Sequence, residues 1–198
     1  YKKPDADGFF RETSELGNRE WGYGREKLRC EILLKKYMEQ HNQYYTIIRP
    51  SITYGDTRIP YHIMPAYGWH WTLVERIRHG KEIPCWNHGE GKTTVTHVSD
   101  FAKGVVGLFM NERAYNNAFH ITTDKVCSWR EIAEAIGYDL GMDVRLIDIP
   151  AKYFVHILPM YRGIIEGSRG RDAMYNNDKI KEAVPDFHCD VDLNTGIA

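Results

Sequence analysis

The sequence predicts an α/β protein built around a mostly parallel β-sheet. Short runs rich in β-branched and aromatic residues alternate with segments whose apolar residues recur at helical spacing, which is typical of parallel sheets covered by helices. A capping box at Ser128-Trp129-Arg130-Glu131 marks the start of one of these helices. At 198 residues the chain is long enough for one domain with a smaller lobe.

The first part of the chain predicts an irregular segment, a long helix, a strand and a loop. Residues 1–18 are polar and rich in Pro, Asp and Gly, so we expect them to lack regular structure. The run at 44–50 indicates a buried strand, and the aperiodic stretch at 51–69 favours a long functional loop. A helix is predicted over about 19–41, with apolar positions at Leu28, Ile32, Leu33 and Tyr37.

The later elements follow the same alternation. Ser99 is expected to cap a helix. The inward positions of that helix are predicted to be Phe101, Val105, Leu108 and Phe109. The other predicted elements are a helix at 70–80, strands at 81–87 and 92–98 around a turn at 88–91, strands at 117–123 and 143–150, and helices beginning at Ser128 and Ala151.

Composition excludes several classes of protein. A formal charge of −1 gives no bulk reason to expect nucleic acid or an anionic membrane as a partner. No apolar run approaches the roughly 18 residues that a membrane span needs. The four cysteines are scattered without a CxxC spacing, so neither a zinc site nor a disulfide framework is indicated. A reducing cytoplasm is therefore the simplest expected location.

Tyr23 and Lys27 are the residues that most directly suggest chemistry. They are four positions apart at the start of the predicted long helix, so both side chains are expected on one face. A phenol has an unperturbed pKa of about 10 and is a poor acid or base at neutral pH, but a nearby ammonium favours the phenolate. The pair could exchange protons with a sugar hydroxyl, or it could share a helix by chance, because this pattern alone is common.

The segments around this pair occur in a meaningful order. After the tyrosine and lysine come "IIRPSITYG", then "GKEIPCWNHGEGKTTVTHVSDFAKGVVGLF", "NAFHITTDKVCSWREIAEAI" and "NNDKIKEAVPDF". Together they resemble the extended short-chain dehydrogenase/reductases, the NAD-dependent nucleotide-sugar epimerases and dehydratases. The resemblance covers nearly the whole chain. It implies a Rossmann-like sheet, incomplete at its N-terminal side, with a smaller α/β substrate-binding lobe.

The resemblance assigns roles to individual residues. Tyr23 would be the general acid/base, and Lys27 would assist it and hydrogen-bond the ribose of the cofactor. Pro50, Ser51 and Ile52 fall where the family's backbone approaches the nicotinamide, beyond the carboxyl end of a strand. The implied cofactor is NAD, although NADP is not excluded.

The resemblance also implies a nucleotide-sugar substrate. The family often has a phosphate-binding arginine in the strand that here reads Lys92-Thr93-Thr94-Val95-Thr96, and no arginine stands there. Arg58 and Arg171 are possible replacements, since a guanidinium fork suits a diphosphate; solvated surface charges are the alternative. The remaining substrate-binding residues expected are Thr53 and Trp69. The aromatic residues of the loop could instead pack onto the smaller lobe.

Parts of the family pattern are missing from the sequence. A Gly-rich turn that would hold the pyrophosphate is absent, and so is the catalytic Ser or Thr expected just before Tyr1. We therefore expect these 198 residues to be the C-terminal portion of a longer enzyme and to be inactive alone. The expected division is 1–54 with 92–122 in the Rossmann-like domain, and 55–91 with 123–198 in the substrate-binding lobe. A homodimer through the helix that carries Tyr23 is possible.

Two classes of function are open at this point. The first is an enzyme: an epimerase, a dehydratase or a simple reductase, which the sequence does not distinguish. The second is a non-catalytic relative that keeps the fold and binds a nucleotide or RNA. The retained Tyr23 and Lys27 favour the enzyme, and the near-neutral charge argues against RNA. His97 is expected to have a structural role near the start of a helix.

Overall fold

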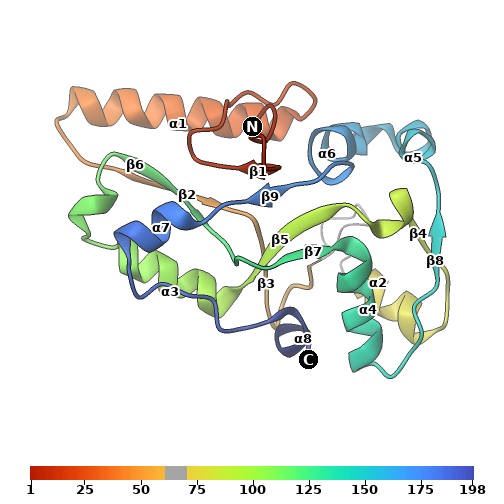
Figure 1. The fold of residues 1–198 in the computed structure, drawn as a ribbon. Coiled ribbons are helices and arrows are strands. Elements are labelled where there is room, and N and C mark those ends of the chain that lie inside the picture. Colours follow the sequence, from red (N-terminus) through yellow and green to blue (C-terminus); the bar gives the residue numbers. More distant parts are fainter. Residues whose placement is uncertain (61–70) are drawn as a thin grey trace.

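A computed structural model describes residues 1–60 and 71–198 of the chain (Figure 1). Its strands are β1 (Phe9–Phe10), β2 (Thr46–Pro50), β3 (Ile52–Tyr54), β4 (Ile83–Cys85), β5 (Lys92–His97), β6 (Asn117–Ile121), β7 (Val126–Ser128), β8 (Leu146–Asp148) and β9 (Met174–Tyr175). Its α-helices are α1 (Gly22–Gln40), α2 (Trp71–Arg78), α3 (Val98–Leu108), α4 (Trp129–Asp139), α5 (Ala151–Ile157), α6 (Arg162–Ile164), α7 (Asp178–Ala183) and α8 (Leu193–Ile197). A single π-helical turn, η4 (Ile165–Arg169), follows α6 directly.

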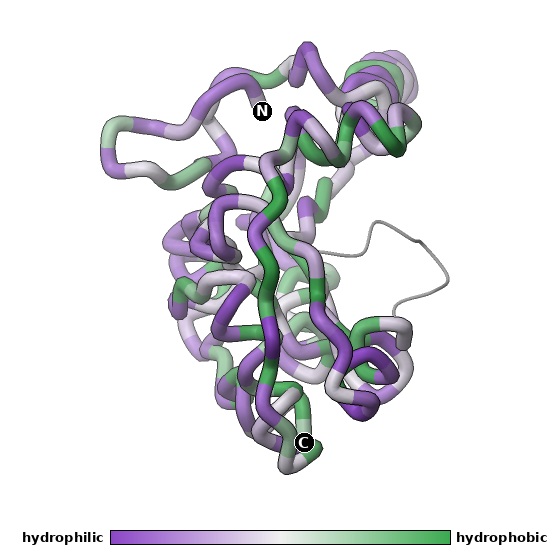
Figure 2. The backbone as a smooth tube through the Cα atoms, turned by 90° about the vertical axis from the view of Figure 1, so that its right-hand side faces the viewer, coloured by the Kyte–Doolittle hydropathy of each residue, from purple (hydrophilic) through white to green (hydrophobic). Residues whose placement is uncertain are grey.

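The strand pairings are mostly parallel, as predicted. β2 pairs with β6 in parallel, and β3 pairs with β5 in parallel. β1 pairs with β9 and β4 with β8, again in parallel, whereas β5 pairs with β7 antiparallel. The N-terminal segment and the C-terminus lie at opposite ends of the molecule (Figure 2). No helix within the described ranges is long and apolar enough to cross a bilayer.

The two strands predicted around the turn at 88–91 do not form a unit together. β4 pairs with β8, and β5 lies between β3 and β7 in another sheet. Short β-branched runs specify a strand but not its partner, because the partner depends on contacts far apart in the sequence. Both predicted strands are therefore present, and the structure adds the partners that the sequence did not predict.

The buried side chains form separate clusters. One lies between α2, α4 and the strands β3 to β5, around Leu73, Ile83 and Ile132. A second joins β6, α3 and α7 around Phe119 and Ile180. Gly104 of α3 is needed here, since an added Cβ would stand 2.7 Å from Ile121. A third cluster packs α5 and α6 against Trp86.

Helix starts follow local side-chain chemistry, although one cap differs from the prediction. The predicted capping box of α4 is present: Ser128 Oγ accepts from the Glu131 amide, and the Glu131 carboxylate accepts from the Ser128 amide. In α3 the cap is His97, whose Nδ1 accepts from the Ser99 amide, and not Ser99 itself. The predicted structural role of His97 is confirmed. Phe109 follows the end of α3 and is 79% exposed, so its predicted inward position is wrong.

The long helix α1 differs most from its predicted packing. None of its residues is fully buried, and three of the four predicted inward positions (Ile32, Leu33 and Tyr37) are more than half exposed. The partly buried positions include Glu31 and Met38, which lie toward the rest of the protein. The neighbouring strand β2 is also incompletely covered, since Ile47 is its only fully buried residue. The prediction of a buried strand at 44–50 therefore holds only in part.

Asp100 fastens the C-terminal segment to α3. Its side chain is fully buried, accepts from Lys103 Nζ at 2.7 Å and accepts from the Val191 amide at 2.9 Å. These donors lower the pKa of Asp100 although burial alone would raise it. Asp100→Asn is expected to lower the free energy of unfolding by about 2–4 kcal/mol, because the buried site would keep donors that an amide satisfies poorly.

Chemical denaturation of the two variants Asp100→Asn and Asp190→Asn checks this prediction. Asp190 also pairs with Lys103, but its side chain is 59% exposed, so its substitution is expected to change stability little. Equal effects of the two substitutions would contradict the importance of the buried carboxylate.

Candidate active site

The segment just before α1 is held by hydrogen bonds from Asn18 and by close backbone packing. Asn18 Oδ1 accepts from the amides of Glu20 at 3.1 Å and Trp21 at 3.0 Å, and its amide donates to the Gly167 carbonyl. An added Cβ on Gly167 would stand 2.7 Å from Trp21 Cβ, so only glycine allows this approach. The first turn of α1 is thereby fixed against η4.

Tyr23 and Lys27 lie one turn apart at this fixed end of the helix. Lys27 Nζ is 5.2 Å from the centroid of the Tyr23 ring, so the two side chains share a face as predicted. The centroid of the Trp21 ring lies 4.9 Å from that of the Tyr23 ring. Tyr23 is 55% exposed, and a cavity of about 600 Å³ opens beside it between the start of α1 and α6. The phenol is therefore accessible to a ligand.

The segment after β2 is fixed by hydroxyl groups at the carboxyl ends of three strands. Ser51 Oγ lies 3.0 Å from Thr122 Oγ1, and Thr96 Oγ1 donates to Thr122 Oγ1 at 3.2 Å. Pro50 ends β2, while Ile52 and Thr53 belong to β3, where Thr53 pairs with Thr96. Thr122 was not among the predicted site residues, although it stands near the end of the strand predicted at 117–123.

Arg49 joins α1 to β2 and was also missed. Its Nε and one terminal nitrogen donate to both Glu31 carboxylate oxygens at 2.8 and 2.6 Å, and the other terminal nitrogen donates to Tyr1 Oη at 2.8 Å and to the Glu12 carbonyl at 3.1 Å. The side chains of Arg49 and Glu31 are 13% and 16% exposed. This bidentate pair sets the distance between the helix that carries Tyr23 and the sheet.

The predicted phosphate-binding arginines lie in different places. Arg171 donates to the carbonyls of Tyr1, Lys2 and Gly167, and its guanidinium lies over the Phe10 ring. These contacts compete with any phosphate. Arg58 is exposed in a turn and lines a separate cavity of about 350 Å³. Neither guanidinium lines the cavity beside Tyr23, and Trp69 lies outside the described residues.

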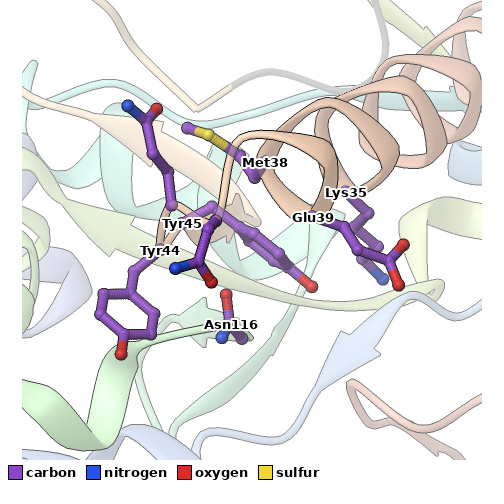
Figure 3. Close-up of a pocket in the computed structure, with 8 residues that line it drawn as sticks. Lys35, Met38, Glu39, Tyr44, Tyr45 and Asn116 are labelled. Atoms are coloured by element: carbon purple, nitrogen blue, oxygen red, sulfur yellow. The ribbon is translucent and has the colours of Figure 1, made fainter.

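A further cavity of about 430 Å³ lies at the opposite end of α1 (Figure 3). Helical rise places Glu39 about 24 Å along the axis from Tyr23, so this cavity is remote from the predicted acid/base pair. Its lining includes Lys35, Met38 and Glu39 of α1 together with Tyr44, Tyr45 and Asn116. No residue with a predicted catalytic or cofactor role lines it.

His120 of β6 is buried beside the Tyr1 hydroxyl, to which its Nε2 is hydrogen-bonded. Burial lowers its pKa; the Glu12 carboxylate and the Asn176 carbonyl oppose this, while Arg49 and Lys179 reinforce it. The unfolded chain thus binds a proton below about pH 6.5 that the folded chain does not, so stability is expected to fall as the pH drops below that value.

The expected slope for this single group is at most about 1.4 kcal/mol per pH unit. Unfolding free energies of the natural protein and of His120→Gln, measured between about pH 7.5 and 5, check it. The variant is expected to be less stable at neutral pH but to lose less stability on acidification. An identical pH dependence in both proteins would contradict the assignment.

This arrangement defines a class of protein: an α/β protein with mostly parallel strand pairings and with a tyrosine and a lysine on one face of a helix beside a cavity. The model of the NAD dependent epimerase/dehydratase family matches residues 1–121, and the chain belongs to this family. The resemblance seen in the sequence is thereby confirmed, and so is the Rossmann-like α/β fold.

Solved structures of similar fold are epimerases and dehydratases. UDP-glucose 4-epimerase from Thermotoga maritima, solved with UDP-glucose, is 21% identical with a TM-score of 0.65, over 88% of this chain and 50% of that one. The dTDP-glucose 4,6-dehydratase DesIV from Streptomyces venezuelae, solved with NAD, is 18% identical with a TM-score of 0.71, over 99% of this chain and 54% of that one. At this identity the likeness shows the fold.

One similar protein is named for binding a stem-loop and not for an enzymatic activity. The chloroplast stem-loop binding protein of 41 kDa b from Arabidopsis thaliana is 29% identical over 109 residues, which is 55% of this chain and 26% of the relative. The chain thus spans about a quarter of this relative and about half of the solved structures. The chain is therefore similar to a protein named for stem-loop binding as well as to proteins named as enzymes.

Proposed function

We propose that this chain carries the proton-transfer part of an NAD-dependent epimerase or dehydratase that acts on a nucleotide-activated sugar. The observation that carries the proposal is the Tyr23–Lys27 pair, which lies at the start of α1 beside an open cavity. Family membership supports it, as do similar structures whose names contain UDP-glucose and dTDP-glucose. Residues 1–54 with 92–122, and 55–91 with 123–198, are proposed as the two functional divisions.

Tyr23 would take the proton from a sugar hydroxyl as the adjacent carbon is oxidised, and would return it when the ketone is reduced. Lys27 would stabilise the phenolate by its positive charge. Nicotinamide, when bound, supplies the hydride acceptor and donor for this oxidation. The order of later steps separates epimerase, dehydratase and reductase, and Tyr23 would serve the first step of each.

The residues present fit the nicotinamide end of such a cofactor. The Lys27 ammonium makes no ion pair within residues 1–60 and 71–198, so it is available to a ribose hydroxyl. Ser51 is held in place by Thr122, which keeps the Pro50–Ile52 backbone ready for a planar ring. The sequence has no Gly-rich turn for the pyrophosphate, so tight NAD binding is proposed to need groups outside these 198 residues.

The proposal is tested on the protein at its natural length. With NAD and either UDP-glucose or dTDP-glucose, we expect a new sugar species in proton NMR spectra, either an epimer or a keto sugar. Absence of any product from both sugars and from their epimers would contradict the proposal. Submicromolar NAD binding by residues 1–198 alone would contradict the expected need for further groups.

A second candidate function is RNA binding, which the stem-loop binding relative favours. Arg25, Arg29 and Lys36 are exposed on one face of α1, at spacings that place them in one stripe. Fluorescence anisotropy with a labelled stem-loop RNA at two salt concentrations tests it. Submicromolar, salt-dependent binding that an Arg25→Gln, Arg29→Gln, Lys36→Gln triple variant abolishes would favour this function over the enzyme.

Location and assembly remain proposals as well. We propose a cytoplasmic protein, since all four cysteines are free in the structure. A homodimer through α1 is proposed because Leu33 and Tyr37 expose apolar surface on that helix. Light scattering of the protein at its natural length, with Leu33→Glu as the variant, measures the dimer: a monomer in both cases would contradict it.

A further inference from the structure

The cavity at the far end of α1 lies at the amino ends of two paired strands. Tyr45 stands directly before β2 and Asn116 directly before β6, and both line this space of about 430 Å³ (Figure 3). Thr46 pairs in parallel with Asn117, so the cavity lies at the edge where both strands start. Ligands of open α/β sheets bind beyond the opposite, carboxyl ends, where Pro50 lies. The cavity is therefore separate from the site proposed for cofactor and substrate.

The two segments that form this cavity are fastened to each other by hydrogen bonds. The Asn116 amide donates to the Tyr45 carbonyl at 2.7 Å, and Thr46 Oγ1 donates to the Ala114 carbonyl at 2.9 Å. Asn116 has a left-handed backbone conformation with φ of 59°, which asparagine adopts more readily than most residues. The fold itself therefore sets the shape of the cavity, and its volume is typical of small-molecule sites.

Several polar side chains that line the cavity have no partner in the described part of the protein. Within residues 1–60 and 71–198, no hydrogen bond engages the side-chain amides of Asn42, Gln43 and Asn116. Lys35 and Glu39 are four positions apart on α1 but form no ion pair with each other or with other described residues. Carboxamides both donate and accept, the ammonium donates and the carboxylate accepts. The cavity thus suits a ligand whose edge carries donors and acceptors side by side.

A stacked pair of tyrosines stands beside these polar groups. The centroids of the Tyr44 and Tyr115 rings are 4.6 Å apart, and the ring planes differ by 9°. Tyr44 lines the cavity and is 66% exposed, so the face of its ring that Tyr115 does not cover is open to another planar group. Exposed aromatic rings of this kind are the usual stacking platforms for nucleobases.

We infer that this cavity binds an unpaired nucleobase. A base has a flat aromatic face, which stacks on Tyr44, and an edge of donors and acceptors, which the Asn42 and Asn116 carboxamides bind as such groups bind adenine. Lys35 supplies a positive charge for the attached phosphate. The inference is independent of the reaction proposed for Tyr23, because the cavity lies at the other end of α1.

The base comes either from a free mononucleotide or from the loop of an RNA. The second source builds on the second candidate function: the exposed stripe of Arg25, Arg29 and Lys36 ends at Lys36, which directly follows Lys35 of the cavity. Helical rise gives this stripe a length of about 16 Å along α1, and its charges suit the phosphates of a stem. A stem bound along the stripe would have its loop at the cavity.

Two kinds of probe, added to the natural-length protein with NAD in excess, distinguish these sources. The first is a labelled stem-loop RNA with unpaired adenines in its loop, compared by fluorescence anisotropy with the same stem carrying an abasic loop. The second is AMP, GMP, CMP and UMP, measured by calorimetry. Tyr44→Ala is expected to weaken binding of the base-bearing ligand by about 5- to 150-fold, and Asn116→Gly by about 3- to 10-fold. Neither variant is expected to change binding of the abasic RNA.

Matched controls for both variants lie outside the cavity. Tyr138→Ala removes a phenol of α4 that is 86% exposed, and Asn87→Gly changes an exposed asparagine that also has a left-handed backbone, with φ of 51°. Neither residue lines the cavity, so both variants are expected to bind every probe as the natural protein does.

A loss in Tyr44→Ala that is limited to the base-bearing RNA would assign the site to an RNA loop, and a loss limited to a mononucleotide would assign it to a free nucleotide. Equal binding of the two RNAs, together with mononucleotide binding that Tyr44→Ala leaves unchanged, would overturn the inference but leave RNA binding by the stripe intact. Binding of neither RNA and of no mononucleotide would overturn both the inference and the second candidate function. Sugar turnover that depends on Tyr23 is a separate readout of the proposed enzyme.

Discussion

Tyr23→Phe is expected to lower turnover of the natural-length protein by about 10²- to 10⁴-fold, which is the usual contribution of a positioned acid or base. The phenylalanine keeps the ring that contacts Trp21 and Lys27 but has no group that can hold or release a proton. Because the ring packing is retained, binding of NAD and of the sugar nucleotide is expected to change by less than about threefold. The kinetic constants and the NAD dissociation constant measure both effects.

Tyr37→Phe is the matched control for this variant. Tyr37 lies on the same helix and is also 55% exposed, but it lines no cavity that contains Tyr23. Its substitution is expected to leave turnover unchanged. Unchanged turnover in Tyr23→Phe would contradict the acid/base role of Tyr23. Unchanged behaviour of this variant in every assay would favour a binding protein that keeps the fold.

Arg49→Met is expected to lower the free energy of unfolding by about 3–5 kcal/mol, which is typical of breaking a buried ion pair by removing one partner. The methionine would leave the Glu31 carboxylate without its bidentate donor in a site where both side chains are largely buried. It would also remove the guanidinium donor to Tyr1 Oη and to the Glu12 carbonyl. The N-terminal segment and α1 would therefore lose their main polar attachment to β2.

Denaturant unfolding and hydrogen exchange measure this effect. Arg29→Met is the control, because Arg29 pairs with Glu26 at a position where both side chains are mostly exposed. Amide exchange along α1 is expected to be faster in Arg49→Met than in the natural protein. In the control variant it is expected to be unchanged. Equal stability of the two variants would show that the helix is held by other contacts.

The sequence predicted the order of the helices and strands better than it predicted which strands pair with each other. The α4 capping box and the structural role of His97 were readable because they depend on residues within one turn of each other. The pairing of β4 with β8 was not, because 60 or so residues separate the strands and no local pattern records it. Phe109 was misplaced because α3 ends one residue earlier than the apolar pattern.

Only the part of the candidate site that is formed by residues close together in the sequence was predictable. Tyr23 and Lys27 share a face because helical geometry fixes positions four apart. The contacts of Arg49 and Thr122 depend on chain segments that meet only in the fold. Arg171 illustrates the converse: its position in the chain suggested phosphate binding, but the fold places three backbone carbonyls around it.

The central claim is that Tyr23 passes a proton while a sugar carbon is oxidised by bound NAD. The most direct measurement is the absorbance of reduced nicotinamide after the natural-length protein, loaded with NAD, is mixed with UDP-glucose or dTDP-glucose in a stopped-flow instrument. We expect a transient rise in the natural protein and a rise slowed by at least about 100-fold in Tyr23→Phe. A rise of equal rate in both proteins, or none with either sugar nucleotide, would contradict the account.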